Sequence, residues 1–240
     1  MSDHIVKAYD EDLAALKTMI AHMGGLAEDQ LDKSIDALAR RDLALAEQVI
    51  QADRKIDELE RQIEERAILT IARRQPMARD LREIMVAIRI SSDLERIGDL
   101  AKNTAKRAHA ISETLPRRLA AGLTRTGRLA QAELKNILDA YARSDADKAM
   151  EVWRSDEELD ALYTSVFREL LTYMMEDPRN ISLCTHLLFG TKNLERIGDH
   201  ATNIAENIYY LVHGRTVGEE RPKKDATSQL NLRGAADGKG

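Results

Sequence analysis

The sequence has few of the residues that strands, disulfides or irregular structure require. Aromatic residues make up only 4% of its 240 residues, and there are four prolines, twelve glycines and one cysteine, Cys184. Charged residues reach 32%, and a chain dominated by Ala, Leu, Glu, Lys and Arg is typical of long helices. The single cysteine excludes an internal disulfide and suits a reducing compartment. We therefore predict an all-α fold.

Long apolar runs and an excess of positive charge are also missing. No run approaches the roughly 18 apolar residues of a membrane span, and residues 1–13 lack the apolar core of a signal peptide. We therefore expect a cytoplasmic protein without membrane insertion. The net charge of −5 gives no general attraction to nucleic acid, so nucleic acid is not an expected partner.

The sequence does contain an internal duplication. The segment Leu-Glu-Arg-Ile-Gly-Asp occurs at Leu94–Asp99 and again at Leu194–Asp199. Around it, residues 94–105 match residues 194–205 at nine of twelve positions. A unit of about 100 residues is too long for a solenoid repeat, so the pattern indicates duplication of a whole domain.

Apolar residues recur at alternating spacings of three and four, which is the period of helices packed in a bundle. The clearest series are Val49, Ala52, Ile56, Leu59, Ile63 and Cys184, Leu187, Thr191, Leu194, Gly198, Ala201, Ala205, Ile208, Val212. The pattern predicts six helices, at residues 5–39, 42–73, 77–113, 117–142, 145–175 and 180–213. Asp42 and Asp145 are candidate N-caps, and Pro76 and Pro178 follow the ends of two helices.

Three helices in each half predict two three-helix bundles, because short connections make consecutive helices antiparallel neighbours. We expect the first bundle at residues 1–114 and the second at residues 115–213. Residues 214–240 hold five of the twelve glycines and few apolar residues. We expect this segment to be a disordered tail.

Each half carries two pairs of carboxylates at i and i+4, a spacing that puts both members on one helix face. The pairs are Asp53/Asp57 and Glu95/Asp99 in the first half, and Asp156/Asp160 and Glu195/Asp199 in the second. Their positions beside the apolar series place them at the rim where two helices meet. Within each half, the two pairs could therefore face each other and form a cluster.

Four clustered carboxylates would raise one another's pKa unless a cation neutralised them. An all-oxygen ligand set suits hard cations such as Mg, Ca, Mn or iron, whereas zinc prefers His or Cys. Asn103 and Asn203 lie one turn further on and could add a carbonyl ligand. Alternatively, these are ordinary acidic residues on wet helix faces, partly paired with Arg96 or Arg196. Acidic pairs at this spacing are common on helices, which favours the second interpretation. The duplication of both pairs supports the first, so both interpretations stay open.

Two further features bear on the site. Gly98 and Gly198 lie mid-helix, where glycine costs about 1 kcal/mol against alanine, and their recurrence predicts a close approach of a neighbouring helix. His200 projects about 100° around the helix from Asp199, and we expect a surface histidine rather than a ligand. The sequence has no phosphate-cradling glycine loop, no Gly-x-Ser-x-Gly and no usefully spaced Cys–His pair. We therefore expect no enzyme.

Four segments form a distinctive set. They are Met23-Gly24-Gly25, Ala72-Arg-Arg-Gln-Pro76, the two LERIGD helices and Thr172-Tyr-Met-Met-Glu-Asp-Pro178. Together they resemble the PhoU family of phosphate-transport accessory proteins, over about residues 5–213. The resemblance implies two similar three-helix bundles.

The resemblance also implies a function. Members of the family are negative regulators of the phosphate-starvation response and act as adaptors. They link a phosphate-specific ABC transporter, through its ATPase subunit, to a sensor histidine kinase and modulate phosphate uptake. A homodimer at the inner face of the membrane is expected. The alternative function is that of a carboxylate-based metal-binding or metal-storage protein.

Some family members hold multinuclear iron or other metal clusters through Glu/Asp-x-x-x-Asp motifs, and the four pairs given above match that pattern. One position breaks the symmetry of the two halves. Glu206 extends the second-half stripe, whereas its counterpart Lys106 is cationic and could take the place of metal charge. We therefore expect the second half to hold metal more firmly.

Overall fold

The computed structural model describes residues 2–111 and 115–218, with side chains from residue 11 onward. These ranges contain seven α-helices, one short 3-10 helix and no strand. The elements are α1 (Ser2–Arg40), α2 (Leu43–Ala52), α3 (Arg54–Arg74), α4 (Arg79–Ala110), α5 (Arg117–Arg143), α6 (Ala146–Glu176), the 3-10 helix η1 (Pro178–Asn180) and α7 (Ile181–His213). The all-α prediction is confirmed.

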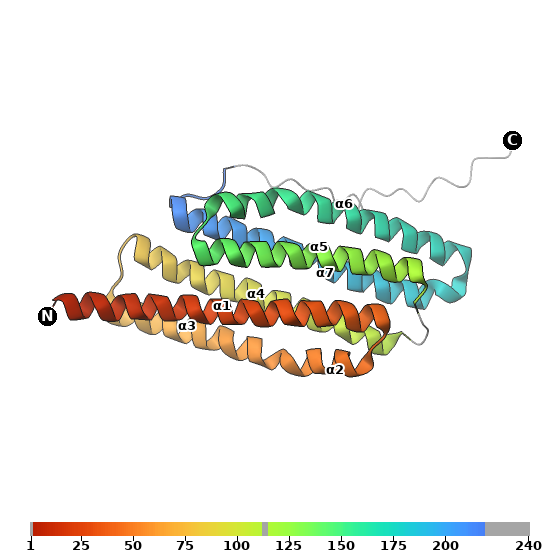
Figure 1. The fold of residues 1–240 in the computed structure, drawn as a ribbon, viewed down its shortest axis with the longest axis horizontal. Helices are drawn as coiled ribbons and strands as arrows, with labels where there is room; N and C mark the ends of the chain where they lie inside the picture. Colours follow the sequence, from red (N-terminus) through yellow and green to blue (C-terminus); the bar gives the residue numbers. More distant parts are fainter. Residues whose placement is uncertain (1, 112–114, 219–240) are drawn as a thin grey trace.

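The long helices run side by side as two three-helix bundles (Figure 1). The first consists of α1, the α2–α3 pair and α4, and the second of α5, α6 and α7. The bundles share a long interface, because α4 packs against α7 and α1 packs against α5. Residues 112–114 of the connection between the bundles lie outside the described part, so the predicted boundary there stays a prediction.

One predicted helix is interrupted in the structure. The segment expected as a single helix at 42–73 is divided into α2 and α3 at Asp53. Asp53 keeps helical dihedrals of φ −53° and ψ −38°, and its carbonyl accepts from the amides of Ile56 at 2.9 Å and Asp57 at 3.2 Å. The interruption is therefore a local tightening of the hydrogen bonds around Asp53.

Helix ends agree with the capping residues read from the sequence. The Asp42 carboxylate accepts from the Leu45 amide at 2.9 Å, and Asp145 accepts from the Lys148 amide at 3.0 Å. Both are N-caps, as predicted. The helix predicted at 77–113 is shorter, since α4 ends at Ala110 and Ile111 is already extended.

The core lies along the predicted apolar series. Ile56, Ile63 and Cys184 are fully buried, and the only tryptophan, Trp153, is 2% exposed. Val212, at the end of the series on α7, is instead 41% exposed. None of the described helices is both long and apolar enough to cross a bilayer. Most of the predicted tail, residues 219–240, falls outside the described residues.

Candidate functional site

The first-half carboxylates gather where the α2–α3 junction meets α4. Asp53, at the junction, is buried, and its Oδ1 accepts from Gln30 Nε2 of α1 at 3.0 Å. Its Oδ2 accepts from the ammonium of Lys102 on α4. The same ammonium donates to Asp99 Oδ1 at 2.5 Å. A lysine therefore bridges the two aspartates.

The rest of the first-half set lies nearer the surface. Burial raises the pKa of Asp57 and of Glu95. The nearby carboxylates of Asp53 and Asp99 raise the pKa of both groups further. Burial lowers the pKa of Lys102, but its hydrogen bonds to Asp53 and Asp99 outweigh this and hold the pKa above its ordinary value. Lys102 is therefore positively charged at neutral pH.

The second-half cluster is more deeply buried. Asp156, Asp160 and Glu195 are each at most 4% exposed, and Asp199 is half-buried. A fifth carboxylate, Glu133 of α5, is 3% exposed and joins them. Glu133 is not among the predicted site residues, although extending the duplication back to the first helix of each half pairs it with Gln30. An amide in the first half is thus a carboxylate in the second.

Both LERIGD glycines lie at close helix contacts, as predicted. A Cβ added to Gly98 would lie 2.9 Å from Ile56 Cδ1. A Cβ added to Gly198 would overlap Leu159 and would lie 2.8 Å from Asp156 Oδ1 and 3.0 Å from Glu133 Oε2. The absence of a side chain at residue 198 therefore leaves the space in which carboxylates of two other helices approach α7.

Glu195 has a strongly raised pKa. Burial raises its pKa to about 7, the Lys192 hydrogen bond opposes the rise, and Asp199 and Asp160 add to it. Its Oε1 accepts from Lys192 Nζ at 2.7 Å. Its Oε2 is buried and has no hydrogen-bond partner among the described residues. An acceptor in that condition is a position at which a cation would be stabilised.

Two of the further candidate ligands, Asn203 and Glu206, form hydrogen bonds with residues outside the second-half cluster. Asn203 donates to Asp93 Oδ1 of α4 at 3.3 Å, and Glu206 accepts from Trp153 Nε1 at 3.0 Å. Lys106, the expected substitute for metal charge, is exposed. Asn103 is half-buried on α4. The difference between the halves therefore lies at the cluster itself and not at Lys106 and Glu206.

His200 is not the surface histidine that was expected. It is half-buried, and its Nδ1 lies 2.9 Å from Asp93 Oδ1. Because α7 carries His200 and α4 carries Asp93, this contact joins the two bundles. Asp93 lies 107 residues away from His200 in the sequence, so spacing along one helix gives no sign of this partner.

The residues of the two halves fit a metal ion unequally. In the first half, an ammonium already occupies the position between Asp53 and Asp99. In the second half, the candidate ligand atoms are all oxygens, as hard cations prefer, and Glu195 Oε2 is buried with no hydrogen-bond partner among the described residues. Among the side chains that the structure describes, no three of His, Cys, Asp or Glu are already placed to hold one metal ion. A bound ion would therefore require the second-half carboxylates to turn toward it.

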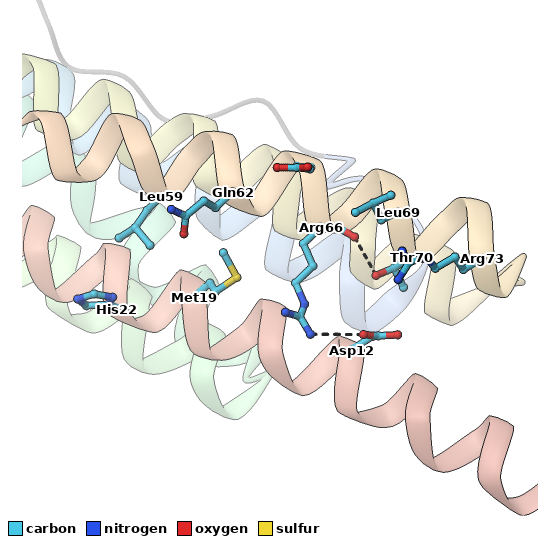
Figure 2. A pocket seen from close by; sticks show the side chains of 10 residues that line it. Asp12, Met19, His22, Leu59, Gln62, Arg66, Leu69, Thr70 and Arg73 are labelled. Atoms are coloured by element: carbon cyan, nitrogen blue, oxygen red, sulfur yellow. Dashed lines mark hydrogen bonds and ion pairs between the residues drawn. The ribbon is translucent and has the colours of Figure 1, made fainter.

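A separate groove of about 680 Å³ runs between α1 and α3 (Figure 2). Met19, Leu59 and Leu69 supply its apolar lining. Arg66 Nη2 contacts Asp12 Oδ1 at 3.3 Å, and Arg74 Nε contacts Asp12 Oδ2 at 3.2 Å. Asp12 is thus neutralised by two arginines. Among its described lining residues, the groove therefore has no group of clustered carboxylates like those of the two halves.

The fold and the clusters define a class: tandem three-helix-bundle proteins with an acidic cluster in each half. The sequence profile described as "PhoU domain" matches residues 20–108 and again residues 123–208. The chain belongs to the PhoU family.

Similar proteins span nearly the whole chain. A phosphate-specific transport system accessory protein PhoU homolog of Rhizobium meliloti is 59% identical over 228 residues, covering 95% of this chain and 96% of that protein. One of Caulobacter vibrioides is 52% identical over 230 residues, covering 95% and 100%. The crystal structure of PhoU from Pseudomonas aeruginosa superposes with a TM-score of 0.83 at 42% identity, covering 86% of this chain and 100% of that chain.

Proposed function

We propose that this accessory protein of phosphate transport is a negative regulator of the phosphate-starvation response. In this role it links the ATPase subunit of a phosphate-specific ABC transporter to a sensor histidine kinase at the inner face of the membrane. The observation that carries the proposal is the double match to the PhoU domain, together with a 59% identical relative named as a phosphate-specific transport accessory protein. Transmission would occur through a shift between binding states, without covalent chemistry in this chain.

Exposed apolar side chains support an adaptor role. Around the connection between α3 and α4, Ile68 is 63% exposed and Met77 is 80% exposed. Leu69, Leu81 and Met85 of the same region are also exposed. Large apolar side chains that stay in water near one another are typical of surfaces that bind other proteins.

A pull-down tests the adaptor proposal. The purified full chain is the prey, and the baits are the cytoplasmic domain of the phosphate sensor kinase and the ATPase subunit of the transporter. An unrelated histidine kinase domain and an unrelated ABC ATPase are the matched controls. We expect retention on both cognate baits and on neither control. Failure to bind either cognate bait at cellular concentrations contradicts the proposal.

We also propose that the second-half cluster takes a hard divalent cation or a small multinuclear cluster, such as iron, Mn, Mg or Ca. The unpartnered Glu195 Oε2 and the buried carboxylates Asp156 and Asp160 support it. When bound, the cation would neutralise carboxylates that burial otherwise destabilises. The chain's own part is to present these oxygens from α5, α6 and α7 around Gly198.

Elemental analysis of the purified protein tests the metal proposal. Asp199→Ala and Glu195→Ala should each lower the bound metal, because each removes a ligand from the second half. Lys106→Ala is a control at an exposed residue and should leave the metal content unchanged. Equal metal content in the wild type and in both ligand variants excludes these residues as ligands.

A further inference from the structure

Lys102 places a positive charge inside the first-half cluster. Its ammonium contacts Asp53 from the α2–α3 junction and Asp99 from its own helix. The lysine side chain is 20% exposed and the Asp53 side chain is 6% exposed. A cation held between two partly buried carboxylates interacts with them more strongly than it would in open water. It therefore compensates the burial of Asp53.

Other residues of the chain also compensate the negative charge of the first-half cluster. Gln30 Nε2 donates to Asp53 Oδ1 and to the Gly98 carbonyl, at 3.0 Å and 3.2 Å. Arg96 lies 3.4 Å from Glu95 and 3.9 Å from Asp99. Hydrogen bonds and cations from the chain itself thus reach three of the four acids of this half.

The duplication supplies the comparison. The residue equivalent to Lys102 is Thr202, which is fully buried and whose hydroxyl donates to the Asp199 carbonyl at 2.7 Å. The residue equivalent to Gln30 is Glu133. Lys192 provides a cation on this side and contacts Glu195; its first-half counterpart is Ser92.

We propose that Lys102 is the built-in cation of the first-half cluster, so that the first half takes no metal ion, and that the Lys102/Thr202 difference directs a divalent cation to the second half. A metal ion entering the first half would have to displace a charged ammonium and leave it beside the new cation. That repulsion and the loss of two ion pairs both oppose binding. The second clause rests on the proposed metal function of the second half, whereas the first does not.

Mn²⁺ binding to the full chain tests the proposal. After dialysis against MnCl2, protein-bound manganese is measured by elemental analysis in the wild type and in Lys102→Thr. We expect Lys102→Thr to bind roughly twice as much manganese, since it opens a second cluster. Adding Asp53→Asn and Asp99→Asn to Lys102→Thr should return binding to the wild-type amount. No gain in Lys102→Thr overturns the proposal.

The wild type provides a direct control. Asp53→Asn with Asp99→Asn in the presence of Lys102 should leave bound manganese unchanged. If this pair of changes lowers it, the first half binds metal despite Lys102, and the proposal fails while the metal function stands. If the wild type binds no manganese but Lys102→Thr does, the second-half metal function fails while the role of Lys102 is supported.

The reciprocal exchange tests the second half. Thr202→Lys should reduce bound manganese to a small fraction of the wild-type amount, and Thr202→Val, which removes the hydroxyl without adding charge, should not. Thr202→Lys that binds manganese as the wild type does contradicts the directing role of this position.

Melting temperature gives a readout that does not depend on metal content. In EDTA, Lys102→Thr should melt below the wild type, and Mn²⁺ should restore it, because a metal then replaces the lost ammonium. Lys102→Arg keeps the charge and should melt near the wild type in EDTA. Should Lys102→Thr fold only with Mn²⁺, the proposal is supported. Should Mn²⁺ leave its melting temperature unchanged, it is contradicted.

Discussion

Gly198 of α7 lies in close contact with side chains of both α5 and α6. Its missing side chain admits Leu159 and the carboxylates of Asp156 and Glu133. A glycine inside a helix costs about 1 kcal/mol in helix propensity, so its presence must be offset by the packing that it permits. Gly25 of α1 is exposed, and a Cβ added there would meet no atom within 4 Å. Replacing Gly25 by alanine should therefore stabilise the protein, whereas replacing Gly198 should destabilise it.

Gly198→Ala should lower the free energy of unfolding by about 1–2 kcal/mol, because the strain of overpacking exceeds the gain in helix propensity. Gly25→Ala is the matched control and should raise it by about 0.5–1 kcal/mol. Urea denaturation monitored by circular dichroism measures both. A stabilised Gly198→Ala variant would show that the close approach at this residue does not matter.

Helix ends depend on single side chains. Asp42 caps α2 by accepting from the Leu45 amide at 2.9 Å, and Asp145 caps α6 by accepting from the Lys148 amide at 3.0 Å. Each satisfies an amide that has no partner inside its helix.

Asp42→Ala and Asp145→Ala should each cost about 1 kcal/mol of stability, as the loss of an N-cap does. Asp42→Asn keeps an oxygen acceptor and should cost only a few tenths of that. Thermal unfolding of the three variants compares them. Equal loss in Asp42→Asn and Asp42→Ala would assign the effect to charge and not to capping.

Features that arise within one helix could be predicted from the sequence. The apolar series, both caps and the two glycine contacts depend on periodicity and on local chemistry, and the structure confirms them. The break at Asp53 has no proline or glycine to mark it. It coincides with a buried carboxylate held by Gln30, 23 residues upstream, and Lys102, 49 residues downstream. Partners so distant in sequence cannot be read from spacing.

The site was predicted only in part for the same reason. The i, i+4 pairs place two carboxylates on one face, but they do not show what a third helix contributes. Glu133 enters from α5 and Lys102 lies over Asp53 only once the bundles have formed. The Lys106/Glu206 difference can be read directly from the sequence, but it does not distinguish the two clusters. Glu206 accepts a hydrogen bond from Trp153 and not from a cluster residue.

At the scale of the whole molecule, the two bundles pack against each other along one long interface. The α4 and α7 helices pack against each other, α1 packs against α5 (Figure 1), and the His200–Asp93 contact joins α7 to α4 at 2.9 Å. Separate unfolding of either bundle would expose this interface to water, which is unfavourable. The two halves should therefore unfold as one cooperative unit.

Denaturation followed by two probes tests this cooperativity. Trp153 is the only tryptophan and reports on the second bundle, while far-ultraviolet circular dichroism reports on all helices. We expect the two unfolding curves to coincide. A Trp153 fluorescence midpoint clearly displaced from the circular dichroism midpoint would show that the bundles unfold independently.

Repression of the phosphate-starvation response is the proposed role of the whole molecule. Its most direct test is the transcription of phosphate-starvation genes in cells grown with excess phosphate, with and without this protein. We expect transcription to rise when the protein is removed and to return to its low level when the wild-type chain is restored. Transcription that stays low without the protein would contradict the account.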